Sequence, residues 1–169
     1  MNIAEYNSCV DQFSDFVYRF LLKSVRDIQT AQDLVQDSFV KLWIAHKDLD
    51  ASKAKSYLFS CAHNAMIDYL RRNQHTDDLD KSTNTPQSSF KQYNDIQEIL
   101  EVALSNMKPE QRSVILLRDL QGYSYQEIAD ITGLNIAQVK VYIFRGRLFL
   151  KQFLEKSHIY SFDDLVESL

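Results

Sequence analysis

The sequence predicts an all-α protein built from two small helical domains. Its 169 residues include only three Gly and two Pro, so few residues interrupt a helix. Apolar residues recur at three- and four-residue spacing along most of the chain, as on one face of a helix. One polar stretch with few apolar residues, residues 75–94, separates two such patterns and is predicted to be a flexible linker.

Three helices are expected in the first domain, residues 1–74. Residues 3–25 form the first helical pattern, and Thr30 is expected to cap the second helix. The polar stripe of this second helix consists of Asp33, Gln36, Asp37 and Lys41. A polar loop, residues 47–56, leads into a third helix that should end near Asn73. The pattern of the second helix, taken alone, indicates an amphipathic surface helix.

The second domain, residues 95–156, begins with a predicted helix from Asn94 to Asn106. Pro109 suits the first turn of the next helix, where a missing N–H costs nothing. Gly122 is expected to stop that helix. The remaining residues, 157–169, form an acidic tail that matches no motif and for which the sequence provides no functional account.

A helix-turn-helix is predicted within this second domain. Ser124 and Glu127 form a capping box at the start of a short helix, and Gly133 can adopt the positive φ of a sharp turn. Asn135 then caps a longer helix. Four basic residues and no acidic residue lie in this helix before Leu154: they are Lys140, Arg145, Arg147 and Lys151. This concentration favours nucleic-acid binding over a solvated helix in an ordinary bundle.

Segments of both halves resemble the extracytoplasmic-function (ECF) sigma factors of the bacterial sigma-70 family. In the first half the similar segments are Asp-Leu-Val-Gln-Asp-Ser-Phe (33–39) and the run from Ser56 to Arg72. In the second half they are residues 104–112, 114–118, 122–129, 139–140 and 144–147. Tyr57 departs from this family, which often has a tryptophan there. The resemblance covers most of the chain in one order, so it implies a sigma2-like helical bundle followed by a sigma4-like helix-turn-helix domain.

The resemblance also implies partners and site residues. Core RNA polymerase would be bound through its β′ coiled coil and β flap, with the β′ contact made by Asp33, Gln36, Asp37 and Lys41. Asn64 would line the pocket for a flipped minus-10 base, whereas the residues alone favour an ordinary exposed helix residue at this position. Arg71 and Arg72 would contact phosphates. The minus-35 element would be contacted by Arg118, Tyr125, Lys140, Phe144 and Arg145, and Arg147 is a further expected DNA-binding residue. Val141 and Tyr142 depart from residues common in the family, which leaves the base preference open.

Further consequences of the resemblance concern the linker and regulation. In the family the linker threads past the polymerase active centre, whereas the residues alone are equally consistent with a passive tether. Control by an anti-sigma factor is implied, and no residue here demonstrates it. The alternative function is a stand-alone helix-turn-helix regulator of the LuxR type, for which the first domain offers no receiver pattern or heptad seam. An adaptor that binds only protein would leave the basic helix unused.

Composition excludes several other classes of protein. The net charge of −4 argues against a protein that coats DNA and indicates weak DNA binding by the isolated chain. Cys9 and Cys61 are too few for a disulfide framework and indicate a cytoplasmic protein. No signal peptide, membrane span or direct membrane insertion is predicted. The four histidines are scattered without metal-ligand spacing, so no metal, cofactor or catalytic residue is expected.

Overall fold

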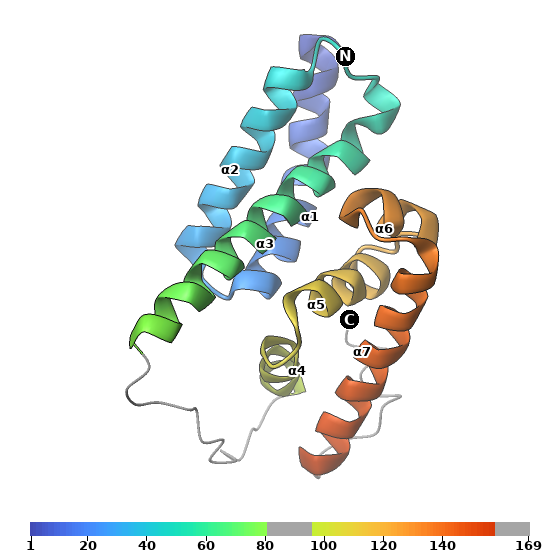
Figure 1. The fold of residues 1–169 in the computed structure, drawn as a ribbon. Coiled ribbons are helices and arrows are strands. Elements are labelled where there is room, and N and C mark those ends of the chain that lie inside the picture. Colours follow the sequence, from blue (N-terminus) through green and yellow to red (C-terminus); the bar gives the residue numbers. More distant parts are fainter. Residues whose placement is uncertain (81–95, 158–169) are drawn as a thin grey trace.

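The computed structural model describes residues 1–80 and 96–157 (Figure 1). Every regular element in these two ranges is a helix, which confirms the all-α prediction. The α-helices are α1 (Ile3–Val25), α2 (Ile28–Ala45), α3 (Ala54–Asp80), α4 (Ile96–Ser105), α5 (Pro109–Ile115), α6 (Tyr125–Thr132) and α7 (Ile136–Ser157). A 3₁₀ turn, η1 (Ala51–Lys53), precedes α3, and a π-helical turn, η2 (Leu116–Leu120), continues α5.

Helices α1, α2 and α3 form one bundle with a shared apolar core (Figure 1). Helix α1 begins with a capping box between Asn2 and Glu5 and ends at Arg26, which adopts a left-handed conformation with φ of 59°. The predicted cap of α2 was wrong. Asp27, in extended conformation, accepts a hydrogen bond from the Thr30 backbone at 2.7 Å, so α2 starts one turn earlier than Thr30 predicted.

Helix α3 is longer than the sequence pattern indicated. It was expected to end near Asn73 and continues to Asp80. Neither Gly nor Pro occurs between Asn73 and Asp80, so no residue there forces a helix to stop, and polar composition alone does not. Most of the predicted linker, residues 81–94, and the tail from residue 158 lie outside the described residues. The domain limits 1–74, 75–94 and 95–156 therefore stay predictions.

Helices α4 to α7 form the second bundle, in which α7 packs along α5 and against α6 and α4. Pro109 occupies the first turn of α5, as predicted. The last turn of this helix widens into η2, where the Gln121 backbone donates to the Leu116 carbonyl at 3.1 Å. Gly122 follows with φ of 72° and reverses the chain, so its predicted role as the stop is confirmed.

The two bundles pack against each other through α6 and α3, with α1 and α5 adding further contacts (Figure 1). The Phe59 ring lies between Phe20 and Tyr123, at centroid distances of 5.8 and 5.2 Å. Gln121 also donates a hydrogen bond of 3.3 Å to the carbonyl of Phe16. Apolar contacts thus run without a break from one bundle into the other, in an arrangement called here the closed packing.

Candidate nucleic-acid interface

The helix-turn-helix is built from α6, a glycine turn and α7. Ser124 and Glu127 exchange both hydrogen bonds of a capping box, at 3.2 and 2.8 Å. Gly133 ends α6 in the left-handed conformation with φ of 73°. Asn135 and Gln138 form a second reciprocal pair, at 2.9 and 2.8 Å, which fixes the start of α7. These three predictions from sequence are confirmed.

Gly146 brings α7 against α5. A Cβ at this position would lie 2.7 Å from Ile115 Cγ1 and 3.0 Å from Met107 Cε, closer than a side chain tolerates. The buried side of α7 consists of Val139, Ile143, Gly146, Leu150 and Leu154. The opposite side of the same helix is therefore held outward, in a position that is set by packing against α5.

Several predicted DNA-contacting residues meet next to the buried side of α7. A groove of about 400 Å³ is lined by Tyr125, Lys140, Ile143, Phe144, Arg147, Leu148 and Lys151. The guanidinium of Arg118 lies over the Tyr125 ring at 4.9 Å and donates to the Tyr123 carbonyl at 2.8 Å. Arg147 pairs with Asp119 at 2.5 Å, a hydrogen bond that raises the pKa of Arg147. The groove combines cations with exposed rings, and both can contact nucleic acid.

Other predicted residues lie elsewhere. Arg145 is exposed on α7 but does not line the groove. Asn64, Arg71 and Arg72 are exposed on α3, and none of them lines the groove either. The Arg72 Nε donates to the Asp68 carbonyl at 3.2 Å, and Arg71 lies 3.9 Å from the Asp68 carboxylate. The structure thus separates the predicted residues into one set on α3 and another around α7.

The polar stripe of α2 is exposed over its whole predicted length, at Asp33, Gln36, Asp37 and Lys41. Two large apolar residues on the same helix, Val40 and Ile44, are 54% and 74% exposed. They follow Asp37 and Lys41 by three residues, so they lie on the same face of the helix. Sequence reasoning missed both, although apolar residues at helical spacing within a polar stripe were the available signal. The exposed surface of α2 thus combines charged and large apolar side chains, a composition that suits contact with another protein.

The seam between the bundles contains polar groups without hydrogen-bond partners. Among the described residues, three buried side-chain atoms lack a partner: His63 Nδ1, Arg112 Nε and the Tyr123 hydroxyl. Each belongs to a helix or turn that contacts the other bundle. Burial raises the pKa of Tyr123. Burial also lowers the pKa of His63 to about 4, although the negative charge of Glu110 acts on His63 in the opposite direction. The closed packing therefore excludes water from groups that favour it.

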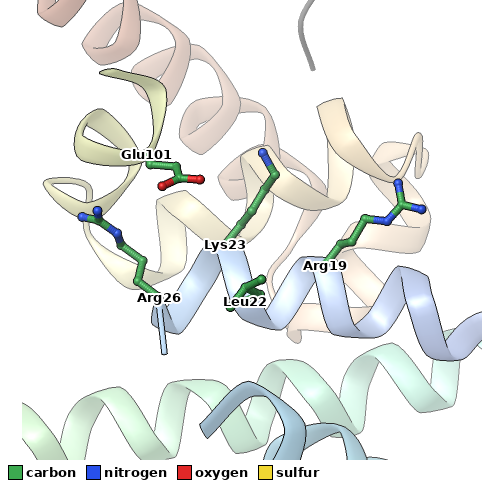
Figure 2. Close-up of a pocket in the computed structure, with 5 residues that line it drawn as sticks. All are labelled: Arg19, Leu22, Lys23, Arg26 and Glu101. Carbon is green, nitrogen blue, oxygen red and sulfur yellow. The ribbon is translucent and has the colours of Figure 1, made fainter. Parts of the chain in front are cut away.

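A polar pocket of about 330 Å³ lies at the edge of the same seam (Figure 2). It is lined by Arg19, Leu22 and Lys23 of α1, by Arg26 directly after that helix, and by Glu101 of α4. Figure 2 shows Glu101 on the α4 side and the cations along α1. Charges of opposite sign thus face each other across the seam and favour its closure at low ionic strength.

Residues 9–76 match the family model for sigma-70 region 2, and residues 97–150 match that for sigma-70 region 4. The chain is 36% identical over 141 residues to the ECF RNA polymerase sigma factor SigM of Bacillus subtilis, covering 80% of this chain and 86% of that protein. The chain belongs to the ECF sigma factors. It is also 30% identical over 156 residues to the sigma factor YlaC of the same organism, covering 86% and 90%.

A solved relative supports the fold. The sigma factor RpoE from Bartonella quintana, in its co-crystal structure with the anti-sigma factor NepR, superposes with a TM-score of 0.73 at 24% identity, covering 90% of this chain and 98% of that chain. As an ECF sigma factor, the chain recruits core polymerase to specific promoters and starts transcription. The LuxR-type alternative is not supported, because region 2 is present together with region 4. No described helix is long and apolar enough to cross a bilayer.

The folded ECF sigma factor is expected to lose stability as the pH falls from 7 to 5. The pKa of His63 is about 4 when folded and 6.5 ordinarily, so the unfolded chain takes up the proton first. Neutral His63 contributes fully to the free energy of unfolding above pH 6.5. Between pH 6.5 and pH 4 this contribution falls by about 1.4 kcal/mol per pH unit, so about 2 kcal/mol has been lost at pH 5. Urea unfolding at pH 7, 6 and 5 measures this loss. His63→Gln is expected to flatten it, and equal pH dependence of the two proteins would rule out His63 as its source.

Proposed function

We propose that the groove side of α7 reads the minus-35 element. The observation that carries this proposal is the gathering of Tyr125, Lys140, Phe144 and Arg147 in one groove, with Arg118 stacked on Tyr125. Arg145 is exposed on the same helix outside this groove and adds a further cation to α7. In a helix-turn-helix the second helix lies in the major groove, where arginine and lysine read guanine edges and also hold phosphates.

The exposed residues of α3 would act at the minus-10 element. Asn64 would hydrogen-bond a base that has left the stack, and the few kcal/mol needed to extrude that base would be offset in its pocket. Arg71 and Arg72 would hold phosphates and position the strand without reading sequence. Support comes from the match of residues 9–76 to region 2 and from the exposure of all three side chains.

The exposed face of α2 would dock on the β′ coiled coil of core polymerase. The charged residues Asp33, Asp37 and Lys41, together with Gln36, would set its orientation. The exposed apolar pair Val40 and Ile44 would supply buried area at the centre of the contact. The second bundle would meet the β flap. Because the polymerase would be bound by α2 and by another part of the second bundle, the groove of α7 would remain available for promoter DNA.

An anti-sigma factor is the further partner that we propose. RpoE of Bartonella quintana, which superposes on this chain with a TM-score of 0.73, was solved in complex with the anti-sigma factor NepR. CnrH, with a TM-score of 0.69, was solved in complex with the cytosolic domain of CnrY. The protein would act in the cytoplasm as a non-enzymatic initiation factor without a cofactor. The cytoplasm is where its polymerase and promoter DNA are found.

The promoter-reading proposal is tested with Lys140→Ala and Arg145→Ala in holoenzyme, on promoters randomised at the minus-35 element. Both variants are expected to lower minus-35-dependent transcription, and at least one should relax base preference by about 1–3 kcal/mol, the value of a bidentate contact. A variant that loses only a phosphate contact should instead lower the salt slope by about one unit. Arg72→Ala is the comparison variant and should weaken all promoters alike. Wild-type output and ranking in both α7 variants would contradict the proposal.

The polymerase-docking proposal is tested with Asp37→Arg. This change reverses a charge on the exposed stripe of α2 without touching the buried side, so helicity should be retained. Affinity for core polymerase is expected to fall by about 2 kcal/mol or more, because reversal replaces attraction with repulsion at a charged contact. The matched control is Asp11→Arg, on the exposed surface of α1. Equal core affinities for the two variants, measured by fluorescence titration, would remove α2 from the interface.

A further inference from the structure

The pocket at the edge of the seam contains more positive charge than nearby acids neutralise (Figure 2). Four residues on its α1 side have the i, i+3, i+4, i+7 spacing of one helix face: Arg19, Leu22, Lys23 and Arg26. The α4 side contributes one acid, Glu101. Arg19 already pairs with Asp15, whereas neither Lys23 nor Arg26 forms an ion pair with any carboxylate in the two described ranges. Two cations thus remain for one acid.

A third cation lies close to this pocket. The buried Arg112 guanidinium donates to three backbone carbonyls. Burial and, as a smaller cause, the positive charge of Arg26 lower the pKa of Arg112. Lys23 is itself half-buried, which removes part of the water that would solvate its ammonium group. An anion in the pocket would replace that water and offset the repulsion among these cations.

The end of α1 does not repel an anion, although the last carbonyls of a helix carry partial negative charge. The Leu22 carbonyl accepts from the Arg26 backbone at 2.8 Å, and the Ser24 carbonyl accepts from the Arg112 guanidinium. Arg26 makes its contact in a left-handed conformation with φ of 59°, which glycine and asparagine adopt at lower cost. Strained residues concentrate at ligand-binding sites, so the arginine at this turn supports such a site.

We propose that this pocket binds a small phosphate ester that also carries hydroxyl or amino groups, the shared chemistry of sugar phosphates and nucleotides. The phosphate oxygens would accept hydrogen bonds from Lys23 and Arg26, since ammonium and guanidinium groups are strong donors to phosphate. An ionised carboxylate only accepts, so Glu101 would receive O–H or N–H groups of the same ligand. The cavity of about 330 Å³ lies at the lower end of the range for small-molecule sites, about 300–1,000 Å³.

The two sides of the pocket belong to different bundles, so a bound ligand would favour the closed packing. A ligand that needs both sides stabilises the conformation in which they meet. At about 100 times its Kd, the ratio of closed to open protein rises about 100-fold. Such a ligand would lower promoter binding, and this consequence rests on the proposed contacts of α3 and α7 with two separate promoter elements.

Isothermal titration calorimetry of the full chain with glucose 1-phosphate and with ADP tests the site, and the tighter ligand identifies the source. Lys23→Gln and Arg26→Asn should each weaken that ligand about tenfold or more, because each removes a charge-assisted hydrogen bond. Asparagine suits the left-handed conformation at this turn, so the fold should be retained. The matched control is Lys47→Gln, which should leave affinity unchanged. Lys47 is exposed near the opposite end of α1, where the Met1 ammonium donates to the Leu49 carbonyl.

A second measurement isolates the role of Glu101. Inorganic diphosphate supplies phosphate charge without the hydroxyl or amino groups of a sugar or base. Its affinity should rise about tenfold in Glu101→Gln, because the substitution removes a repelling charge. The affinity for the phosphate ester should instead fall, because the carboxylate that accepts its hydroxyl or amino groups is lost. A rise for both ligands would overturn the role of Glu101 as an acceptor.

The binding result and its consequence can fail separately. No binding of either phosphate ester at millimolar concentration would overturn the proposal, as would equal affinities in Arg26→Asn and Lys47→Gln. Citrate that binds as tightly as the better phosphate ester would overturn the phosphate class. Ligand binding without any fall in promoter occupancy by the holoenzyme would keep the pocket and overturn its control of initiation. Wild-type promoter output in Lys140→Ala would contradict the proposed function of α7 and leave the calorimetric result unaffected.

Discussion

A covalent link that holds the two bundles together is expected to reduce transcription from a two-element promoter by about 100-fold. Cysteines at Phe16→Cys and Gln121→Cys, joined by a bismaleimide, would span the seam where the Gln121 amide reaches the Phe16 carbonyl at 3.3 Å. The minus-10 and minus-35 elements are about 25 base pairs apart, which corresponds to about 85 Å at 3.4 Å per base pair. A compact chain of this length is only about 40 Å across. A protein held in the closed packing therefore cannot contact both promoter elements at once. Losing the contacts to one element, worth about 2.7 kcal/mol, lowers occupancy of the promoter about 100-fold.

The control for this experiment is reversal of the link. A bismaleimide with a cleavable disulfide spacer should restore output when it is reduced. Each single-cysteine variant treated with the same reagent should keep full activity, because Cys9 and Cys61 are buried. Full output from the linked protein would show that the closed packing does not have to open for initiation.

The second large effect is expected from Arg112→Met. The buried Arg112 guanidinium donates to the Ser24 carbonyl at the end of α1, and to the carbonyls of Ser105 at 3.0 Å and Met107 at 3.2 Å after α4. The last carbonyls of a helix lack intrahelical donors and carry partial negative charge, so one cation satisfies two helix ends from different bundles. Methionine matches much of the volume but donates nothing. We expect a loss of about 3 kcal/mol in the free energy of unfolding and a more open protein in solution scattering.

Two comparison variants isolate this role. Arg112→Lys keeps the positive charge, but its single ammonium cannot span carbonyls from two helix ends, so it should recover only part of the loss. Lys108→Met removes a positive charge from an exposed position nearby and should leave stability within about 0.5 kcal/mol of the starting protein. A similar loss in Lys108→Met and Arg112→Met would mean that net charge, and not the shared guanidinium, supports the seam.

Local signals in the sequence predicted the elements well. Ser124, Gly133 and Asn135 act through partners within a few residues, so their roles could be derived from the chain alone. The start of α2 was misplaced because Asp27 and Thr30 are both good capping residues and only the backbone geometry distinguishes them. The continuation of α3 to Asp80 was missed because a polar sequence does not by itself forbid a helix.

Contacts between residues far apart in the chain could not be predicted from the sequence. Arg112 and Ser24 are 88 residues apart, and no local pattern indicates that a charged residue of α5 is buried against α1. The groove residues around Lys140 were predicted mainly from family resemblance, and the structure adds Leu148 and Lys151 to its lining. Leu148 was missed because an apolar helix residue is ordinarily assigned to the core, and its exposure depends on how α7 is rotated against α5.

Gly146 and the exposed residues of α7 differ in how freely they can be substituted. A larger residue there would collide with Ile115, so the rotation and depth of the helix are effectively locked to the bundle beneath it. Exposed positions such as Lys140, Phe144 and Arg145 bear no such constraint, because their side chains do not support the core. If α7 reads the minus-35 element as we propose, substitutions at these exposed positions would change promoter choice while the fold stays intact. Gene duplication followed by such changes would yield regulators with separate target genes and one shared scaffold.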